Sequence, residues 1–316
     1  MARGSWRTPA VVLVCGSVIL TLALGIRHGF GLYLQPMSMD HGWGREVFGL
    51  AIAVQNLLWG LTQPFTGMLA DRFGAGKVLF AGGIVYVLGL VCMATASTPL
   101  AFTLGVGVLI GLGMSGTTFN IVYGALGRNF PPEKRSMVLG VASAAGSFGQ
   151  FALMPLALAL ISWQGWFAAL LAMAAIAALI VPLSLGVTDK GYGTLTVASG
   201  ASLGDALREA SCHRGLWLLA LGYFTCGFQI VFIGTHMPAF LIDQGMTAKD
   251  GTIALALIGL FNIFGSYAAG WLGGYLYDAT GSYRVVWLIA IALSAVATLV
   301  NLPIDERPVR GHAAAA

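Results

Sequence analysis

An arginine and a histidine stand side by side inside an otherwise apolar stretch near the N-terminus. Arg27 and His28 occur in the sequence Gly25-Ile26-Arg27-His28-Gly29. A guanidinium can hold a carboxylate through two parallel hydrogen bonds, and an imidazole can exchange a proton near neutral pH. A charge within a membrane segment is costly and by default functional. The pair therefore predicts an anion-binding site. His28 could supply a proton that is bound or released together with the anion. The alternative is that Arg27 extends from its segment to the lipid headgroups.

Neutral polar side chains occupy other positions in the apolar stretches and could line the same cavity as Arg27. Each one taken alone is more often an interhelical hydrogen bond than a ligand contact. Taken together, they are what a water-filled binding cavity requires. With Arg27 and His28, the candidate substrate-binding residues are Tyr33, Gln55, Asn120, Tyr123, Gln150, Tyr223, Gln229 and Asn262.

The acidic residues favour an anionic ligand by their positions. All twelve lie outside the middles of the apolar stretches, whereas a site for a cationic compound needs a buried carboxylate. The four cysteines have no paired short spacing, and the five histidines form no cluster. We therefore expect no metal site, no cofactor and no enzymatic catalysis.

The elements that must position these residues are membrane-spanning helices. Of the 316 residues, 58% are hydrophobic and 9% are charged, whereas about 25% are charged in a typical soluble protein. This composition excludes a soluble enzyme, a nucleic-acid binder and a secreted disulfide module. A helix needs roughly 20 apolar residues to cross the hydrocarbon core. The expected nine spans are 11–34, 47–70, 78–97, 100–124, 136–160, 163–187, 215–238, 252–274 and 285–303.

The basic residues predict the orientation of these spans. If the N-terminus is cytoplasmic, the cytoplasmic segments of the first seven spans hold ten basic residues and the outer loops hold only Arg45 and Lys249. Cytoplasmic loops carry such an excess of Lys and Arg. A cleaved signal peptide is disfavoured, since eight further spans follow the first. We expect an integral protein of the plasma (cell inner) membrane with its N-terminus inside.

The strongest motif lies between the second and third spans. Its sequence is Gly67-Met-Leu-Ala-Asp71-Arg72-Phe-Gly74-Ala-Gly-Lys77, which resembles the signature loop of the major facilitator superfamily. The resemblance implies that Gly67, Asp71, Arg72, Gly74 and Lys77 form a conformational latch between two halves on the cytoplasmic side. Residue 76 departs from the pattern, because it is glycine where a second basic residue is usual. The residues alone also allow an ordinary positive-inside loop.

Two further spans bear on coupling. The fifth span contains Gly140, Gly146 and Gly149, a spacing of small residues that favours close helix packing over the proline-containing glycine motif of the antiporter branch. The fourth span has Gly105 and Gly107 in the region where many proton-coupled members carry a basic residue. The fourth span therefore lacks the residue on which the usual route of proton coupling depends.

The C-terminal part resembles fragments of one branch of the superfamily. Tyr277–Tyr283 resembles the loop after the eleventh span of monocarboxylate and oxalate–formate exchangers, and 257–274 resembles their eighth span. We therefore expect spans nine and ten, and most of eleven, to be missing. The expected fold is an all-α polytopic membrane protein with a complete six-helix bundle (1–187), a central cytoplasmic loop (188–214), a shortened three-helix bundle (215–304) and a tail (305–316). The tail lies outside if the last segment crosses; the alternative is that this segment does not cross and lies against the membrane or the rest of the protein.

The resemblance implies a secondary active transporter that moves a small organic anion, a monocarboxylate or a dicarboxylate, by alternating access. The expected partners are that anion, a coupling proton or counter-substrate, and the lipid bilayer, with no nucleic acid. The alternative is a truncated membrane remnant or scaffold that does not transport.

Overall fold

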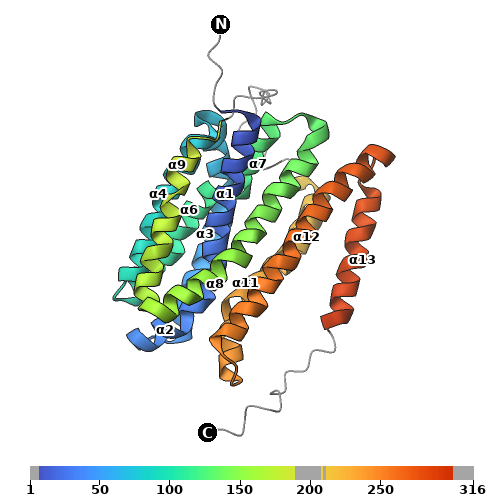
Figure 1. Cartoon of the computed structure of the whole chain (residues 1–316). Coiled ribbons are helices and arrows are strands. Elements are labelled where there is room, and N and C mark those ends of the chain that lie inside the picture. Colours follow the sequence, from blue (N-terminus) through green and yellow to red (C-terminus); the bar gives the residue numbers. More distant parts are fainter. Residues whose placement is uncertain (1–6, 189–207, 209–210, 302–316) are drawn as a thin grey trace.

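A computed structural model describes residues 7–188, 208 and 211–301. In this part of the chain every regular element is a helix, as the sequence predicts (Figure 1). The elements are α1 (Pro9–His28), α2 (Gly31–His41), α3 (Arg45–Phe73), α4 (Ala75–Thr95), α5 (Pro99–Phe102), the π-helix η1 (Thr103–Leu109), α6 (Ile110–Thr117), α7 (Phe119–Asn129), α8 (Pro132–Ala178), α9 (Ile180–Ser184), α11 (Arg214–Asp243), α12 (Ala248–Thr280) and α13 (Arg284–Asn301).

Six helical stretches of the described chain are long and apolar enough to cross a membrane. They are Pro9–His28, Ala75–Thr95, Pro99–Asn129, Pro132–Ser184, Arg214–Asp243 and Ala248–Thr280. Pro132–Ser184 has 53 residues, more than twice the roughly 20 that one crossing needs. The chain turns back within it at Gly165, whose φ is +81°. This stretch therefore holds the fifth and sixth predicted spans.

Two predicted spans fall outside that set. α3 covers 47–70 but carries Gln55, Asn56 and Gln63, and α13 covers most of 285–303 with only 18 residues. Each of the nine predicted segments is helical, so the helical assignment is confirmed. The crossings by α3 and α13 stay predictions.

The predicted loops are shorter than expected. α3 continues through Phe73 and α4 begins at Ala75, so only Gly74 of the predicted loop Asp71–Lys77 is not helical. Gly74 has a φ of +94°, a conformation that costs glycine little and other residues much. α12 likewise continues through Thr280 into the predicted loop Tyr277–Tyr283. These boundaries were wrong because a helix can continue past the hydrocarbon core while its backbone hydrogen bonds still close.

Glycines allow neighbouring helices to approach closely, both within the N-terminal bundle and between it and α12. A Cβ added to Gly25 of α1 would lie 2.5 Å from the carbonyl oxygen of Gly149 on α8. A Cβ on Gly140 would lie 3.0 Å from the Cα of Gly270 on α12. In lipid, close packing of this kind drives helix association. The packing role predicted for the fifth span is therefore confirmed at Gly140 and Gly149.

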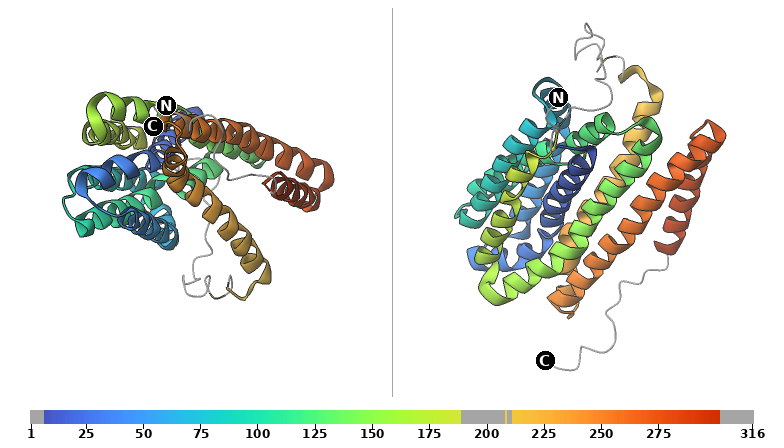
Figure 2. Two further views of the ribbon diagram at one scale, coloured as in Figure 1. Left: turned by 90° about the horizontal axis from the view of Figure 1, so that it is seen from below. Right: turned by 45° about the horizontal axis from the view of Figure 1, so that its top comes forward.

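α12 joins the C-terminal part of the chain to the N-terminal bundle. It packs along α8, where Asn262 donates a hydrogen bond to the Ser147 hydroxyl at 3.0 Å and Ser136 donates one to the Gly270 carbonyl at 2.5 Å. α11 contacts α2 and α12 but leaves most of its surface exposed. Figure 2 shows α13 standing beside α12 and apart from the remaining helices. The C-terminal part is thus more sparsely packed than the N-terminal bundle.

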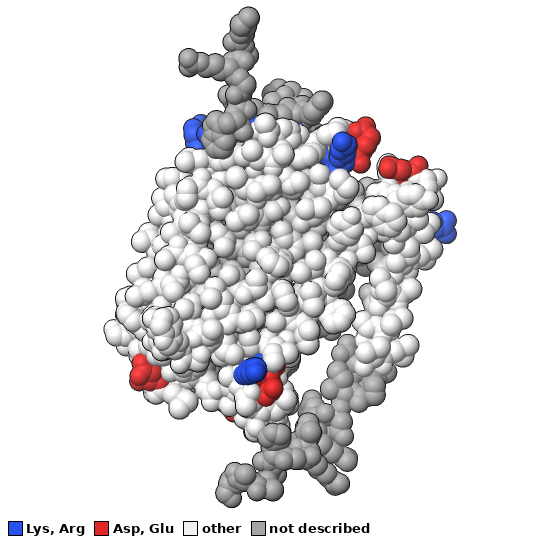
Figure 3. All heavy atoms as spheres, viewed as in Figure 1, with Lys and Arg blue, Asp and Glu red and all other residues white. Residues whose placement is uncertain are grey.

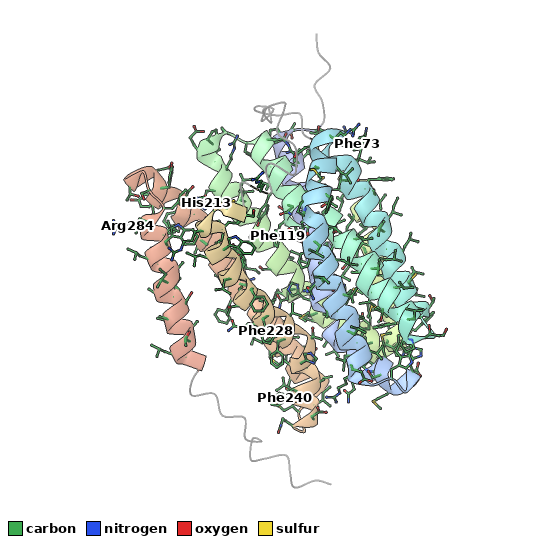
Figure 4. All side chains as sticks on the ribbon, turned by 180° about the vertical axis from the view of Figure 1, so that it is seen from behind. Phe73, Phe119, His213, Phe228, Phe240 and Arg284 are labelled. Atoms are coloured by element: carbon green, nitrogen blue, oxygen red, sulfur yellow. The ribbon has the colours of Figure 1, made fainter. Side chains whose placement is uncertain are left out.

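The bundle has two ends, which are named here after a residue at each. Phe73 lies at one end, called the Phe73 end below, with His213 and Arg284 toward it, and Phe240 lies at the opposite, Phe240 end (Figure 4). On the face drawn in Figure 3, the charged side chains gather at the two ends. α13 runs from the Phe73 end to the Phe240 end (Figure 1). The predicted tail 305–316 and most of the central loop 188–214 lie outside the described residues.

Candidate functional site

Arg27 points into the bundle. Arg27 is the second-last residue of α1, and only 9% of the residue is exposed. The Nη2 atom donates a hydrogen bond to Asn56 Oδ1 at 2.5 Å, and Cζ lies 5.2 Å from the centre of the Trp59 ring. Asn56 is itself anchored, because its Nδ2 donates to the Ile52 carbonyl at 2.7 Å. The alternative that Arg27 extends to the headgroups therefore does not hold.

Polar atoms beside Arg27 are buried without partners. In the described part of the chain, Arg27 Nε and both polar atoms of the Gln55 amide lack a hydrogen-bond partner. Both residues line one small cavity of about 10 Å³, together with His28 and with Gly234 and Thr235 of α11. A buried polar atom without a partner costs about 1–3 kcal/mol. Arg27 Nε and Gln55 Nε2 are thus unsatisfied donors on two residues of one cavity, which has room for about one water molecule in this arrangement. An anionic group that entered the cavity could accept a hydrogen bond from each.

A second cavity of about 530 Å³ adjoins the first. The two share His28, Ile230 and Gly234 among their lining residues. Four predicted site residues line the larger one, namely His28, Gln150, Gln229 and Asn262. The rest of its wall is mainly apolar and comes from α11 and α12: Ile230, Ile233, Gly234, Ala254, Leu255, Leu257, Ile258 and Phe261. The cavity therefore combines amide groups with an apolar interior, as small-molecule sites do.

Two of these polar side chains also hold the wall together. Gln150 Nε2 of α8 donates to the Leu255 carbonyl of α12 at 3.0 Å, and Asn262 bonds to Ser147 as described above. The His28 ring has Nδ1 at 2.6 Å from the Leu24 carbonyl, so a proton on Nδ1 would be held there. His28 Nε2 would then be the ring atom that exchanges a proton.

Four predicted site residues are not brought to these cavities. Tyr33 is buried in the core with its hydroxyl unpartnered among the described residues. Asn120 of α7 donates to Gln63 of α3 at 2.5 Å. Tyr123 and Tyr223 line neither cavity, and Tyr223 is 70% exposed. None of the ten predicted residues is tested as a ligand contact, so their roles stay predictions.

Thr235 is a lining residue that the sequence did not single out. It is buried on α11 beside the small cavity. Its neighbour His236 is the more conspicuous side chain in the sequence. The spacing of residues in the sequence does not indicate which of two adjacent positions faces a partner helix. That depends on how the helix is rotated about its axis.

The predicted latch lies at the turn between α3 and α4. Asp71 Oδ1 forms a 3.0 Å ion pair with Arg128 of α7, and Arg72 lies over the ring of Phe73 at 5.3 Å. Gly74 makes the turn, and a Cβ on Gly67 would meet nothing within 4 Å. The Asp71–Arg128 ion pair lies inside the N-terminal bundle, so the role of these residues in joining two halves stays a prediction.

The structure explains the departure at Gly76. A Cβ there would lie 2.6 Å from the Val187 carbonyl oxygen and 3.0 Å from that of Ser184. The end of the sixth span packs directly on the start of α4. A basic side chain has no room at position 76 in this arrangement.

Residues 13–304 match the Major Facilitator Superfamily. The chain belongs to this superfamily. Together with its apolar helices, this membership makes it an integral membrane protein.

Named relatives place the chain near one branch of the superfamily. It is 28% identical to monocarboxylate transporter 13 of Bos taurus over 91% of this chain and 66% of that protein. It is 29% identical to monocarboxylate transporter 11 of Mus musculus, over 83% of this chain and 58% of that protein. It is 23% identical to the oxalate:formate antiporter of Oxalobacter formigenes, over 92% of this chain and 69% of that protein. The predicted resemblance to this branch is confirmed.

The chain spans about two thirds or less of the length of the first two relatives. The comparisons do not confirm that the difference is an internal loss of spans nine to eleven, which stays a prediction. The names of the relatives point to transport rather than to an enzyme.

Proposed function

We propose that this protein is a secondary active transporter of a small monocarboxylate. The observation that carries the proposal is that Arg27 and Gln55, two buried side chains with unsatisfied polar atoms, line one cavity. A carboxylate would accept hydrogen bonds from Arg27 Nε and Gln55 Nε2. A hydrogen bond to a charged group contributes about 1.5–3 kcal/mol.

One carboxylate rather than two fits the adjoining cavity. The wall of the 530 Å³ cavity contains no Lys or Arg among its described residues. Its apolar side chains suit the body of an organic acid, and the amides of Gln229 and Asn262 suit a neutral polar substituent. A second carboxylate in that cavity would lie against apolar side chains without a counter-charge, which is unfavourable.

The geometry also supports alternating access. At the Phe240 end, Arg45 of α3 and Asp243 of α11 form two hydrogen bonds of 2.8 and 3.0 Å. A Cβ on Gly31 of α2 would clash with the Gly234 carbonyl of α11. The N-terminal and C-terminal parts are therefore closed against each other at this end, and rocking them apart would open the Arg27 site there. His28 would carry the coupling proton, or a second anion would serve as counter-substrate.

The proposal includes an orientation, with the N-terminus in the cytoplasm of a cell whose plasma membrane holds the protein. The Phe73 end would then be cytoplasmic and the Phe240 end external. The distribution of Lys and Arg along the chain supports this orientation.

The experiment is uptake of labelled monocarboxylates into vesicles that contain the purified chain. Arg27→Ala should abolish uptake, and Arg27→Lys should lower it roughly tenfold or more, because a point charge cannot replace the planar fork. Arg135→Lys is the matched control, since Arg135 bonds the Phe130 carbonyl away from the cavities. Unchanged uptake by a folded Arg27→Ala variant would contradict the proposal.

A second function, a membrane scaffold that does not transport, is favoured by the sparse packing of α11 and α13. Large apolar side chains on both helices are exposed, among them Phe228 and Trp287. The same vesicle experiment separates the two functions. No uptake of any carboxylate by the intact, folded chain would support the scaffold, and uptake that Arg27→Ala removes would contradict it.

A further inference from the structure

The helix of the fourth span is interrupted between its two ends. α6 ends at Thr117 and α7 begins at Phe119, and Thr118 between them has an extended backbone with a φ of −109° and a ψ of −160°. Figure 4 shows Phe119 between the Phe73 end and the Phe240 end of the bundle. Irregular backbone at membrane depth is tolerated only where it is buried in protein or lines a cavity. Thr118 is 1% exposed, so the interruption, called the Thr118 break below, is buried in protein.

α3 holds the Thr118 break through side chains on one of its faces. The indole Nε1 of Trp59 donates a hydrogen bond to the Thr118 hydroxyl at 2.9 Å. Two further hydrogen bonds join the same face of α3 to the residues before and after the break, namely Thr66 with Ser115 and Gln63 with Asn120. The three α3 residues follow one another at intervals of four and three, which is the spacing of one helix face. The position of Thr118 therefore depends on α3 as well as on its own span.

The hydrogen bond between Thr118 and Trp59 fixes the orientation of the indole ring. The Thr118 hydroxyl donates its one proton to the Met114 carbonyl at 2.7 Å, so it is free to accept from Trp59. The N–H group is the only polar group of an indole ring. A turn of the Trp59 ring away from Thr118 would therefore leave a donor without its partner, which is unfavourable inside a protein.

The same ring supports Arg27. The guanidinium Cζ lies 5.2 Å from the centre of the Trp59 ring, and a cation over the face of an indole is attracted by the ring. Trp59 thus meets Arg27 with its face and Thr118 with its edge. The single hydrogen bond from Arg27 to Asn56 does not define the plane of the guanidinium group, whereas a ring beneath that group does.

We propose that Thr118 is a positioning residue for anion binding, which acts on Arg27 through the Trp59 ring. This inference rests on the proposed function of the Arg27 site. Thr118 itself lines neither cavity of that site. With its hydroxyl in place, Arg27 stays in the orientation in which it lines the small cavity with Gln55. Without the hydroxyl, the ring and the guanidinium group must be ordered again when a carboxylate binds, and this lowers the affinity.

Uptake kinetics in vesicles that contain the purified full chain test the proposal. The probe is labelled lactate, which has one carboxylate and one neutral polar substituent. Thr118→Val keeps the shape of the side chain and removes the acceptor, so it should raise the half-saturating concentration roughly fivefold, the equivalent of about 1 kcal/mol. The maximal rate should not change, because the lost contribution is to binding. Thr118→Ser keeps the hydroxyl and should restore the original value.

Thr117→Val is the matched control. Thr117 is also fully buried, and its hydroxyl donates to the Gly113 carbonyl at 2.9 Å in the same way. The bond from Trp59 goes to Thr118 and not to Thr117. Thr117→Val should therefore leave the half-saturating concentration unchanged. Equal increases in Thr117→Val and Thr118→Val would show a general packing effect and overturn the proposal.

A double-mutant cycle tests whether the effect passes through the indole N–H. Trp59→Phe keeps an aromatic ring but has no N–H to donate. Thr118→Val should raise the half-saturating concentration in the original chain and have no further effect in the Trp59→Phe background. A further fivefold rise in that background would contradict the proposed route through Trp59.

The NMR signal of the Trp59 indole N–H gives a readout that does not need transport. The signal is assigned by its loss in Trp59→Phe. It should shift in Thr118→Val and in Arg27→Ala, and it should stay in place in Thr117→Val. An unshifted signal in Thr118→Val would overturn the positioning role of Thr118. Lactate uptake that is unaffected by Arg27→Ala would instead contradict the proposed function, and the positioning role would fall with it.

Discussion

At the scale of single residues, the candidate site depends on how α3 holds Arg27. Asn56 accepts a hydrogen bond from one guanidinium nitrogen and Trp59 lies beneath the guanidinium group, while Trp59 itself donates to the Thr118 hydroxyl at 2.9 Å. Arg27 is therefore fixed on one side and unsatisfied at Nε. A side chain preorganised in this way loses little conformational entropy when a ligand binds.

A carboxylate built into the site should act as a permanent substitute for the substrate. We expect Gln55→Glu to place a negative charge beside Arg27 and to abolish carboxylate uptake. The new ion pair should leave the thermal stability of the protein unchanged or raise it. Gln55→Leu should also lower uptake, while it should leave stability unchanged or raise it, because it removes two buried polar atoms that have no partner. Vesicle uptake and melting temperature, measured on both variants, check this, and full activity of Gln55→Glu would contradict it.

At the scale of the elements, the contact between α3 and α11 closes the Phe240 end. The Arg45 guanidinium lowers the pKa of Asp243, since it donates hydrogen bonds to the ionised carboxylate. When the pH is above the usual pKa of a carboxyl, the Asp243 carboxylate is ionised and the ion pair contributes fully. The contribution is lost as the pH falls through the lowered pKa of the folded protein. Acid should therefore loosen this end, and neutral pH should keep it closed.

Removing the ion pair should shift the balance between closed and open forms. Exposed pairs contribute about 0–1 kcal/mol, so Asp243→Asn should raise the open population at the Phe240 end by up to roughly fivefold. Distances between spin labels at the ends of α3 and α11 measure that population. The double variant Arg45→Asp with Asp243→Arg exchanges the two charges and should restore the closed form. In the single variant Asp243→Asn, the open population should no longer respond to acid. An unchanged distance distribution in Asp243→Asn would show that the pair does not hold this end.

At the scale of the whole molecule, a well-packed N-terminal bundle supports a loosely packed C-terminal part. α12 is joined to α8 along its length through the small residues Gly140 and Gly270, whereas α13 stands off from the bundle. The direction of α13 decides on which side of the membrane the chain ends, because each crossing reverses the side.

Thiol labelling of intact cells tests this topology. In a variant whose four native cysteines are serines, an impermeant reagent applied outside should label Lys249→Cys and leave Lys134→Cys unlabelled. Arg310→Cys, which lies outside the described residues, should be labelled if all nine segments cross. Labelling of Lys134→Cys would show that the orientation is the opposite of the one proposed. Protection of Arg310→Cys would show that an even number of segments crosses.

The sequence predicted the helices better than the site. Long apolar runs fixed the helical segments, since a backbone in lipid must satisfy its own hydrogen bonds. The site was predicted only in part. The sequence shows which polar residues lie in apolar runs, but it does not show how each helix is rotated and therefore which of these residues face the cavity. Gln55 and Gln150 therefore reach the cavities, whereas Asn120 instead bonds Gln63.

The sequence by itself determined the class of the protein, its superfamily and the presence of one arginine within an apolar segment. Composition and local motifs suffice for these, because they depend on residues that are neighbours in the chain. Only the tertiary structure decided that Arg27 turns inward to Asn56, that position 76 has no room for a side chain, and that Arg27, Gln55 and Thr235 line one cavity. Each of these depends on helices that are distant in the chain, whose packing is set by close contacts along their whole length.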